Sequence, residues 1–194
     1  MSPSPFTSLP EPFTYAQALE AGLSKHHFYQ LRDEGEIQLL ARGLYLRASS
    51  DIADIDLVEI AMRSPQATLC LTSALVHHGL SDAIPRAHDV AIPRGTRAPA
   101  VSVPVQWHRF DLPTFDIGRQ TRRLSRRVEI GLYSAERTIL DAFRTRRTEG
   151  NELGYEALKR WLRLPGHQPS TLLALSKRFP RTTRPLRQAL EILL

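Results

Sequence analysis

Residues 14–47 constrain the fold more strongly than any other stretch of this chain. Gly22, Leu23 and Ser24 separate two short segments in which apolar residues recur at helical spacing. Two helices that meet at a steep angle need a small residue where they touch and a glycine in the turn, and Ala18 and Gly22 supply these. Ser24 stands where its hydroxyl can cap the second helix. The pattern predicts a helix-turn-helix.

The second helix of this pair is expected to have two different faces. Phe28 and Leu31 lie on one face and should pack on Ala18 and Leu19. The opposite face carries groups that can reach phosphates or base edges. With the capping residue, they form the predicted DNA-contact set, which is Ser24, Lys25, His26, Tyr29, Gln30 and Arg32. Gly35 is placed to end the helix.

A β-hairpin is predicted directly after this helix. Apolar residues mark two short strands, over 37–40 and 44–46, and Arg42 and Gly43 stand in the tight turn between them. An arginine at the tip of a hairpin suits a wing that touches the minor groove or the backbone of DNA, so Arg42 joins the predicted contacts. The alternative is an ordinary helical hairpin and strand pair without a ligand.

The positive charge of the chain is placed away from this module. The 194 residues carry a formal charge of +6, which suggests a polyanionic partner. Residues 1–50 have four Lys and Arg against five Asp and Glu, whereas residues 101–194 have eighteen against nine. Either the C-terminal half supplies phosphate contacts, or that half binds something else.

One basic segment in the second half is a candidate for such contacts. Residues 118–127 hold five arginines and no acidic residue, namely Arg119, Arg122, Arg123, Arg126 and Arg127. Arginine suits bidentate contacts with phosphate or docking to an acidic protein surface. The alternative is a solvated basic loop.

The fold class predicted for the whole chain is α+β. We expect a loose N-terminal arm over 1–12 and a winged helix-turn-helix DNA-binding domain over 1–48. A mixed α/β C-terminal domain should follow over 51–194 and end in helices. Within it, strands are expected over 88–93, 101–109 and 128–132, with the second at an edge because of Pro104. Helices are expected over 54–63, 71–78, 135–146 after a Ser134 cap, 153–162, 172–178 after a Ser170 cap, and from Pro185 onward.

The sequence lacks the residue patterns that several enzyme activities and metal sites require. Asp51, Asp54 and Asp56 lack the preceding Gly-Ser loop of a nucleotidyltransferase, and capping or a solvated helix start is the simpler interpretation. Adjacent histidines, His77 and His78, point in different directions on a helix, so no metal site is predicted. A nuclease core would need an acid-x-lysine strand, which the chain lacks. We therefore predict no catalytic residue, no metal and no cofactor.

Cysteine content and hydropathy suggest a cytoplasmic protein. Cys70 is the single cysteine, which excludes an internal disulfide and suits a reducing compartment. Its apolar neighbours predict a buried small hydrophobe. No stretch is long and apolar enough to suggest a membrane span, and the N-terminus lacks the features of a signal peptide.

Residues 14–47 resemble the N-terminal module of the AbiEi-type antitoxins, the repressor half of bacterial toxin–antitoxin operons. The resemblance rests on the segments 18–24, 29–31 and 42–45 with Gly35, and it continues through 72–75, 79–80 and 134–141. It implies a cytoplasmic bacterial regulator that binds repeats in its own promoter and antagonises a nucleotidyltransferase-like toxin. By this resemblance, the DNA contacts would be Ser24, Lys25, His26, Tyr29, Gln30 and Arg42. The alternative is an antitoxin that binds its toxin directly through the basic C-terminal half.

Overall fold

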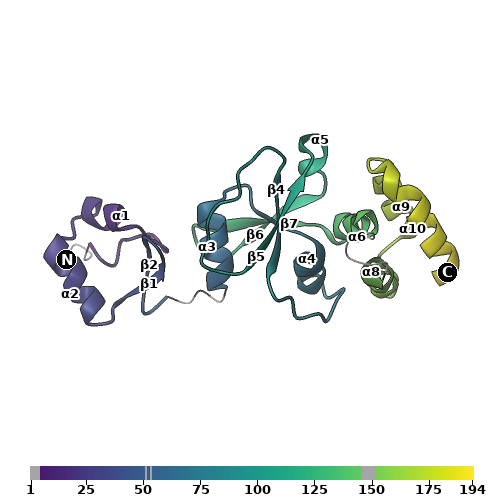
Figure 1. Ribbon diagram of the computed structural model, residues 1–194. Coiled ribbons are helices and arrows are strands. Elements are labelled where there is room, and N and C mark those ends of the chain that lie inside the picture. Colours follow the sequence, from purple (N-terminus) through teal and green to yellow (C-terminus); the bar gives the residue numbers. More distant parts are fainter. Residues whose placement is uncertain (1–4, 51, 53, 146–151) are drawn as a thin grey trace. The chain divides into compact units, whose positions relative to one another are not determined.

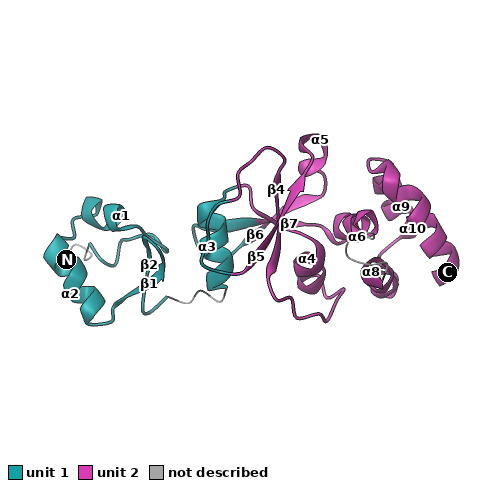
Figure 2. Ribbon diagram, in the orientation of Figure 1, with its two compact units in different colours: residues 1–65, 99–103, 122–130 teal, residues 66–98, 104–121, 131–194 magenta. Residues whose placement is uncertain are grey.

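The computed structural model describes residues 5–50, 52, 54–145 and 152–194, and it has a mixed α+β fold (Figure 1). The chain divides into two compact units (Figure 2). Unit 1 comprises residues 1–65, 99–103 and 122–130, and unit 2 comprises residues 66–98, 104–121 and 131–194. Unit 1 therefore contains the predicted N-terminal domain together with a further helix and two segments from later in the chain.

Unit 1 begins with the two predicted helices. Helix α1 spans Tyr15–Glu20, and Thr14 and Gln17 form a reciprocal capping box at its start. Helix α2 spans Lys25–Asp33, and the Ser24 hydroxyl accepts a hydrogen bond from the His27 backbone N–H at 3.2 Å. Gly22 joins the helices with φ +99°, a conformation that L side chains rarely adopt. The turn and the cap are thus as predicted.

The predicted hairpin follows these helices. Strands β1 (Ile37–Ala41) and β2 (Leu44–Arg47) pair antiparallel, with Ile37 opposite Arg47. Arg42 and Gly43 form the turn, and Gly43 has φ +77°. The hairpin is therefore confirmed, with a tight glycine-containing turn.

A small aromatic and aliphatic core holds α1, α2 and β1 together. Its buried members are Leu9, Phe13, Ala18, Leu23, Phe28 and Ile37. Leu31 packs against this cluster, as predicted. The expectation for Leu19 was wrong, since its side chain is 39% exposed. Helix α1 has only six residues, so one narrow face reaches the core, and Ala18 occupies it.

Helix α3 (Ile55–Arg63) completes the helices of unit 1. Asp54 precedes it, but its side chain makes no capping hydrogen bond. The carboxylate forms an ion pair with Arg122 instead. Asp51, the other predicted cap, lies outside the described residues. Glu59 is buried and accepts hydrogen bonds from the backbone N–H and hydroxyl of Ser102, which holds the 99–103 segment in this unit.

A five-stranded sheet has the order β5-β4-β3-β7-β6. Strand β3 pairs antiparallel with β4 and parallel with β7, while β4 and β5 are parallel. The strands are β3 (Thr68–Leu69), β4 (His88–Pro93), β5 (Val105–Phe110), β6 (Arg119–Arg123) and β7 (Glu129–Tyr133). The strands predicted over 88–93 and 128–132 are confirmed as β4 and β7, and the one predicted over 101–109 is confirmed only from Val105 onward, as the edge strand β5. Sequence reasoning missed β3, which has two residues, and β6, which has no apolar alternation.

Helices make up the rest of unit 2 (Figure 1). They are α4 (Leu71–His77), α5 (Leu112–Phe115), α6 (Ala135–Arg144), α8 (Glu152–Leu162), α9 (Pro169–Ser176) and α10 (Pro180–Leu193). Ser134 caps α6, because its hydroxyl accepts from the Arg137 backbone N–H at 3.2 Å. Buried side chains of α6, α8, α9 and α10 form one core, which includes Leu140, Trp161, Leu172 and Leu186.

The predicted starts of the last two helices were wrong. Helix α9 begins at Pro169, and Ser170 lies inside it. Helix α10 begins at Pro180, and Pro185 lies within the helix. A proline at the first position loses no intrahelical hydrogen bond, so both helices start on one. Pro185 does remove one such bond, and the buried side chains of α10 compensate for the loss.

A buried ion cluster ties α6 to the segment around α5. The Arg137 Nε donates to Asp141 Oδ2 at 2.8 Å, and both side chains are 1% exposed. Arg137 also donates to the backbone carbonyls of Thr114 and Ile117, while Arg144 Nε donates to Asp141 Oδ1 at 3.1 Å. Burial raises the pKa of the Asp141 carboxyl, and the guanidinium groups of Arg137 and Arg144 offset part of the rise.

Cys70 is fully buried, as predicted. Burial, and to a smaller extent the charge of Asp89, raises the pKa of its thiol well above the usual range. Because the thiolate is the reactive form, we expect the folded protein to resist a disulfide-exchange reagent at neutral pH. The denatured chain should react at its single cysteine. Equally fast labelling of folded and denatured protein, followed by absorbance, would contradict the buried placement.

None of the helices in the described part of the chain is long and apolar enough to cross a membrane. Among the same residues, no group of three or more His, Cys, Asp or Glu side chains could hold a metal ion.

Candidate nucleic-acid interface

Helix α2 presents a polar face on the side away from the core. Phe28 is 1% exposed and Leu31 is half-buried, so these two define the inner face. Lys25, His26, Tyr29, Gln30 and Arg32 are exposed, as predicted. His27 is also exposed and was missed from the sequence. Since the Ser24 cap fixes where the helix begins, it also fixes which side chains point outward.

These exposed side chains differ in the contacts that they already make within the protein. The Gln30 amide donates to Glu34 at 2.9 Å, and Arg32 pairs with Asp33 at 2.9 Å. Such exposed contacts are weak, so a ligand can replace them at low cost. Lys25 and His26 form no ion pair with any residue in the described ranges. The beginning of α2 is therefore its most available part.

Tyr29 stands at the centre of an aromatic group. Its ring lies 5.6 Å from the Phe28 ring and 6.2 Å from the Tyr15 ring, centroid to centroid. The Arg32 guanidinium lies 4.7 Å from the centre of the Tyr29 ring. The ring is 38% exposed. Its position is thus held by its neighbours while the residue remains partly exposed to solvent.

The turn of the hairpin places Arg42 at the surface, as predicted. The Arg42 carbonyl accepts a hydrogen bond from Arg63 at the end of α3, at 2.5 Å. This contact anchors the backbone of the turn and leaves the Arg42 side chain exposed. An anchored hairpin tip with an exposed arginine is suited to a phosphate or a minor groove.

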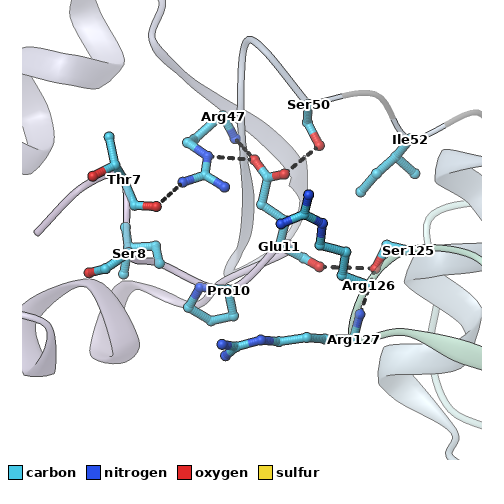
Figure 3. A pocket seen from close by; sticks show the side chains of 11 residues that line it. Thr7, Ser8, Pro10, Glu11, Arg47, Ser50, Ile52, Ser125, Arg126 and Arg127 are labelled. Atoms are coloured by element: carbon cyan, nitrogen blue, oxygen red, sulfur yellow. Dashed lines mark hydrogen bonds and ion pairs between the residues drawn. The ribbon is translucent and has the colours of Figure 1, made fainter. Parts of the chain in front are cut away.

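The N-terminal arm was expected to be loose, but residues 5–12 are held on β2 (Figure 3). Arg47 donates to the Glu11 carboxylate at 2.8 Å and to the Thr7 carbonyl at 2.8 Å. Ser50 donates to the other oxygen of Glu11 at 3.1 Å. The ion pair between Arg47 and Glu11 joins residues far apart in the sequence, so the local pattern of Pro and Ser could not predict it.

A polar pocket of about 500 Å³ lies beside this anchored arm. It is lined by Thr7, Ser8, Leu9, Pro10, Glu11, Arg47, Ser50, Ile52, Ser125, Arg126 and Arg127. In Figure 3 the Arg126 side chain extends toward Glu11, whereas Arg127 extends past Pro10. Both arginines are exposed, and Ser125 links their segment to the arm by donating to the Glu11 carbonyl at 3.2 Å.

The five arginines of the basic segment do not form one surface. Arg119 is half-buried and donates to the Thr68 hydroxyl at 2.8 Å. Arg122 pairs with Asp54, and Arg123 lies 3.6 Å from Glu129. Residues 119–123 form strand β6, so the expected basic loop is limited to the residues that follow it. Of the five, Arg126 and Arg127 are the two whose side chains form neither an ion pair nor a hydrogen bond in the part of the chain that the structure describes.

No protein-family model matches this chain, and no curated protein is similar to it at a significant level.

Proposed function

We propose that this protein is a sequence-specific DNA-binding repressor that serves as the antitoxin of a toxin–antitoxin operon. The observation that carries the DNA-binding part is the geometry of α2, whose outer face is polar and exposed while Phe28 anchors its inner face. The β1–β2 hairpin with the exposed Arg42 follows directly, as in a winged helix-turn-helix. The antitoxin part rests on the sequence resemblance described above.

In the proposed complex, α2 enters the major groove with its N-terminal half toward the bases. Lys25, His26 and Tyr29 are then the candidates for base contacts, and Arg42 contacts the backbone or the minor groove. Gln30 and Arg32 are placed for further contacts once their exposed pairings open. Ser24 acts through its cap, which orients the helix.

Arg126 and Arg127 supply positive charge that the first 50 residues lack. They belong to unit 1, as α2 and the hairpin do, and they lie beside the anchored arm. Because their guanidinium groups are exposed and unpaired with acids in the described chain, they can bind phosphates without first breaking an ion pair. We therefore assign them to sequence-independent backbone contact.

Footprinting on the DNA upstream of the chain's own gene tests the repressor proposal. We expect protection over repeated half-sites, and an affinity for that fragment at least about 10³ times that for a scrambled duplex at the same salt concentration. Equal affinity for both fragments would overturn the repressor proposal.

Coexpression with the product of the neighbouring gene tests the antitoxin part. Rescue of growth without operator binding would assign the chain to direct toxin neutralisation instead.

Changing Arg126 and Arg127 together to glutamine should weaken binding to all duplexes alike. Removing each phosphate-binding arginine is expected to lower the slope of log affinity against log salt concentration by about 0.9. Arg123→Gln is a comparison that removes a single charge from the same segment, at an arginine that already faces Glu129. Fluorescence anisotropy at several salt concentrations gives the slopes. An unchanged slope in the double variant would move these two arginines to a protein partner.

A further inference from the structure

The last two helices carry a second cationic feature that the operator-binding proposal does not use. Residues 157–190 contain eight Lys and Arg and not one Asp or Glu. Five of the cations lie at the junction of α9 and α10 or on α10 itself, and all five are exposed. We call this group the C-terminal cationic surface, and it consists of Lys177, Arg178, Arg181, Arg184 and Arg187.

The arginines of α10 share one side of the helix. Arg181, Arg184 and Arg187 recur at a spacing of three residues, which keeps them on one face. The buried side chains of α10, Thr182, Leu186, Ala189 and Leu190, lie on the opposite face and pack in the core of unit 2. One side of the helix is therefore committed to the fold, and the other side carries the three arginines together with Gln188 and Glu191.

The charge of this surface is not paired with carboxylates within the described chain. No ion pair joins any of the five cations to an acidic side chain of residues 5–50, 52, 54–145 or 152–194. Arg178 and Arg181 also lie at the N-terminal end of α10, where the helix dipole is positive and favours anions. The first turn of α10 has no acidic residue. This arrangement costs stability in the free protein, which is understandable if an anionic partner occupies the surface.

The composition of the surface favours the phosphate backbone of nucleic acid over other anions. Four of its five cations are arginines, whose planar groups bind phosphate through two hydrogen bonds. A protein partner would call for an apolar centre with aromatic side chains. The exposed large apolar residues of α10 and its C-cap, Ile192 and Leu194, are aliphatic and lie at the C-terminal end of the helix, beyond the last arginine. An interfacial membrane helix would expose an apolar face, but that face of α10 is buried.

We propose that the C-terminal cationic surface binds the phosphate backbone of duplex DNA without sequence preference. This surface lies in unit 2, separate in sequence from α2, and its action does not depend on operator recognition. In the full chain it raises affinity for any duplex and supports association with DNA outside the operator.

The test is a triple variant, Arg181→Gln, Arg184→Gln and Arg187→Gln, in the full-length protein. The matched control changes three other exposed arginines of unit 2, Arg86→Gln, Arg97→Gln and Arg109→Gln, and removes the same net charge. Binding to a short random-sequence duplex is followed by fluorescence anisotropy over a range of salt concentrations. We expect the triple variant to bind roughly tenfold or more weakly at low salt, with a salt slope lower by about 2–3, and the control to bind like the parent.

Equal losses of DNA affinity in both triple variants would mean that net charge alone drives binding. An unchanged salt slope in the variant of Arg181, Arg184 and Arg187 would assign the surface to an acidic protein. Either result overturns the proposal. Thermal unfolding separates this role from a structural one. Removing cations from the positive end of α10 should leave the melting temperature unchanged or raised, whereas a structural role predicts a lower one. Unchanged operator preference in variants of α2, together with normal random-duplex binding, would reject only the operator-binding proposal.

Discussion

Replacing Lys25 or Tyr29 by alanine is expected to weaken operator binding by roughly 1–3 kcal/mol for each side chain that reads a base. Lys25 is exposed at the beginning of α2, and Tyr29 is partly exposed to solvent. If both reach base edges, the double variant should bind more weakly than either single variant, and because the two side chains are neighbours on α2 the losses need not add. A gel-shift or anisotropy titration on the footprinted fragment measures this decrease in affinity.

Tyr29 needs a second variant, because its ring also packs on Tyr15 and Phe28. Tyr29→Phe keeps these ring contacts and removes only the hydroxyl. If Tyr29 reads a base through that hydroxyl, the phenylalanine variant should lose affinity and keep the melting temperature of the parent. Gln38→Ala, at an exposed position of β1, serves as the control for surface changes in the same unit. Full operator affinity in both Lys25→Ala and Tyr29→Ala would reject the assignment of α2 as the recognition helix.

Replacing Asp141 by alanine is expected to destabilise the protein by about 3–5 kcal/mol. The carboxylate is buried between the guanidinium groups of Arg137 and Arg144, and its removal leaves both without their acidic partner. Arg137 would still bind the carbonyls of Thr114 and Ile117, but its charge would be buried and uncompensated. Since a domain of this kind is stable by only about 5–15 kcal/mol, a large part of its stability would be lost.

Urea unfolding followed by circular dichroism measures this effect. The comparison is Asp82→Ala, which removes a carboxylate from the exposed pair with Arg160. That change should have little effect, because water screens the exposed pair. Asp141→Asn keeps an acceptor of similar shape and should lie between the two. If Asp141→Ala unfolds at the same urea concentration as Asp82→Ala, the buried cluster does not stabilise the fold in the manner described here.

The features predicted correctly from the sequence depend on residues close together in the chain. Ser24 and Ser134 were assigned as caps because a hydroxyl at that position meets a backbone N–H three residues later. Gly22, Gly35 and Gly43 were assigned to turns and helix ends, and all have positive φ. Such local preferences act within a few residues, so the order of amino acids is enough to identify them.

The availability of the charged side chains depended instead on partners far away in the sequence. Arg119 was expected to contact phosphate or a protein partner, but it donates to Thr68, 51 residues earlier. Arg122 is paired with Asp54, and Arg47 with Glu11, over separations of 68 and 36 residues. Arg137 looks like any helical arginine in the sequence, yet it is the charged centre of a buried cluster.

The amino-acid order of this chain thus specified the caps, turns and amphipathic faces, and with them the outward side chains of α2. Folding in three dimensions selected which arginines of the basic segment keep side chains without partners in the described chain, namely Arg126 and Arg127 in unit 1, and it left the cations of α9 and α10 exposed in unit 2. The physical reason is that backbone preferences are short-ranged along the chain. Ion pairing and burial, in contrast, depend on which distant segments meet, and residue spacing alone does not encode those meetings.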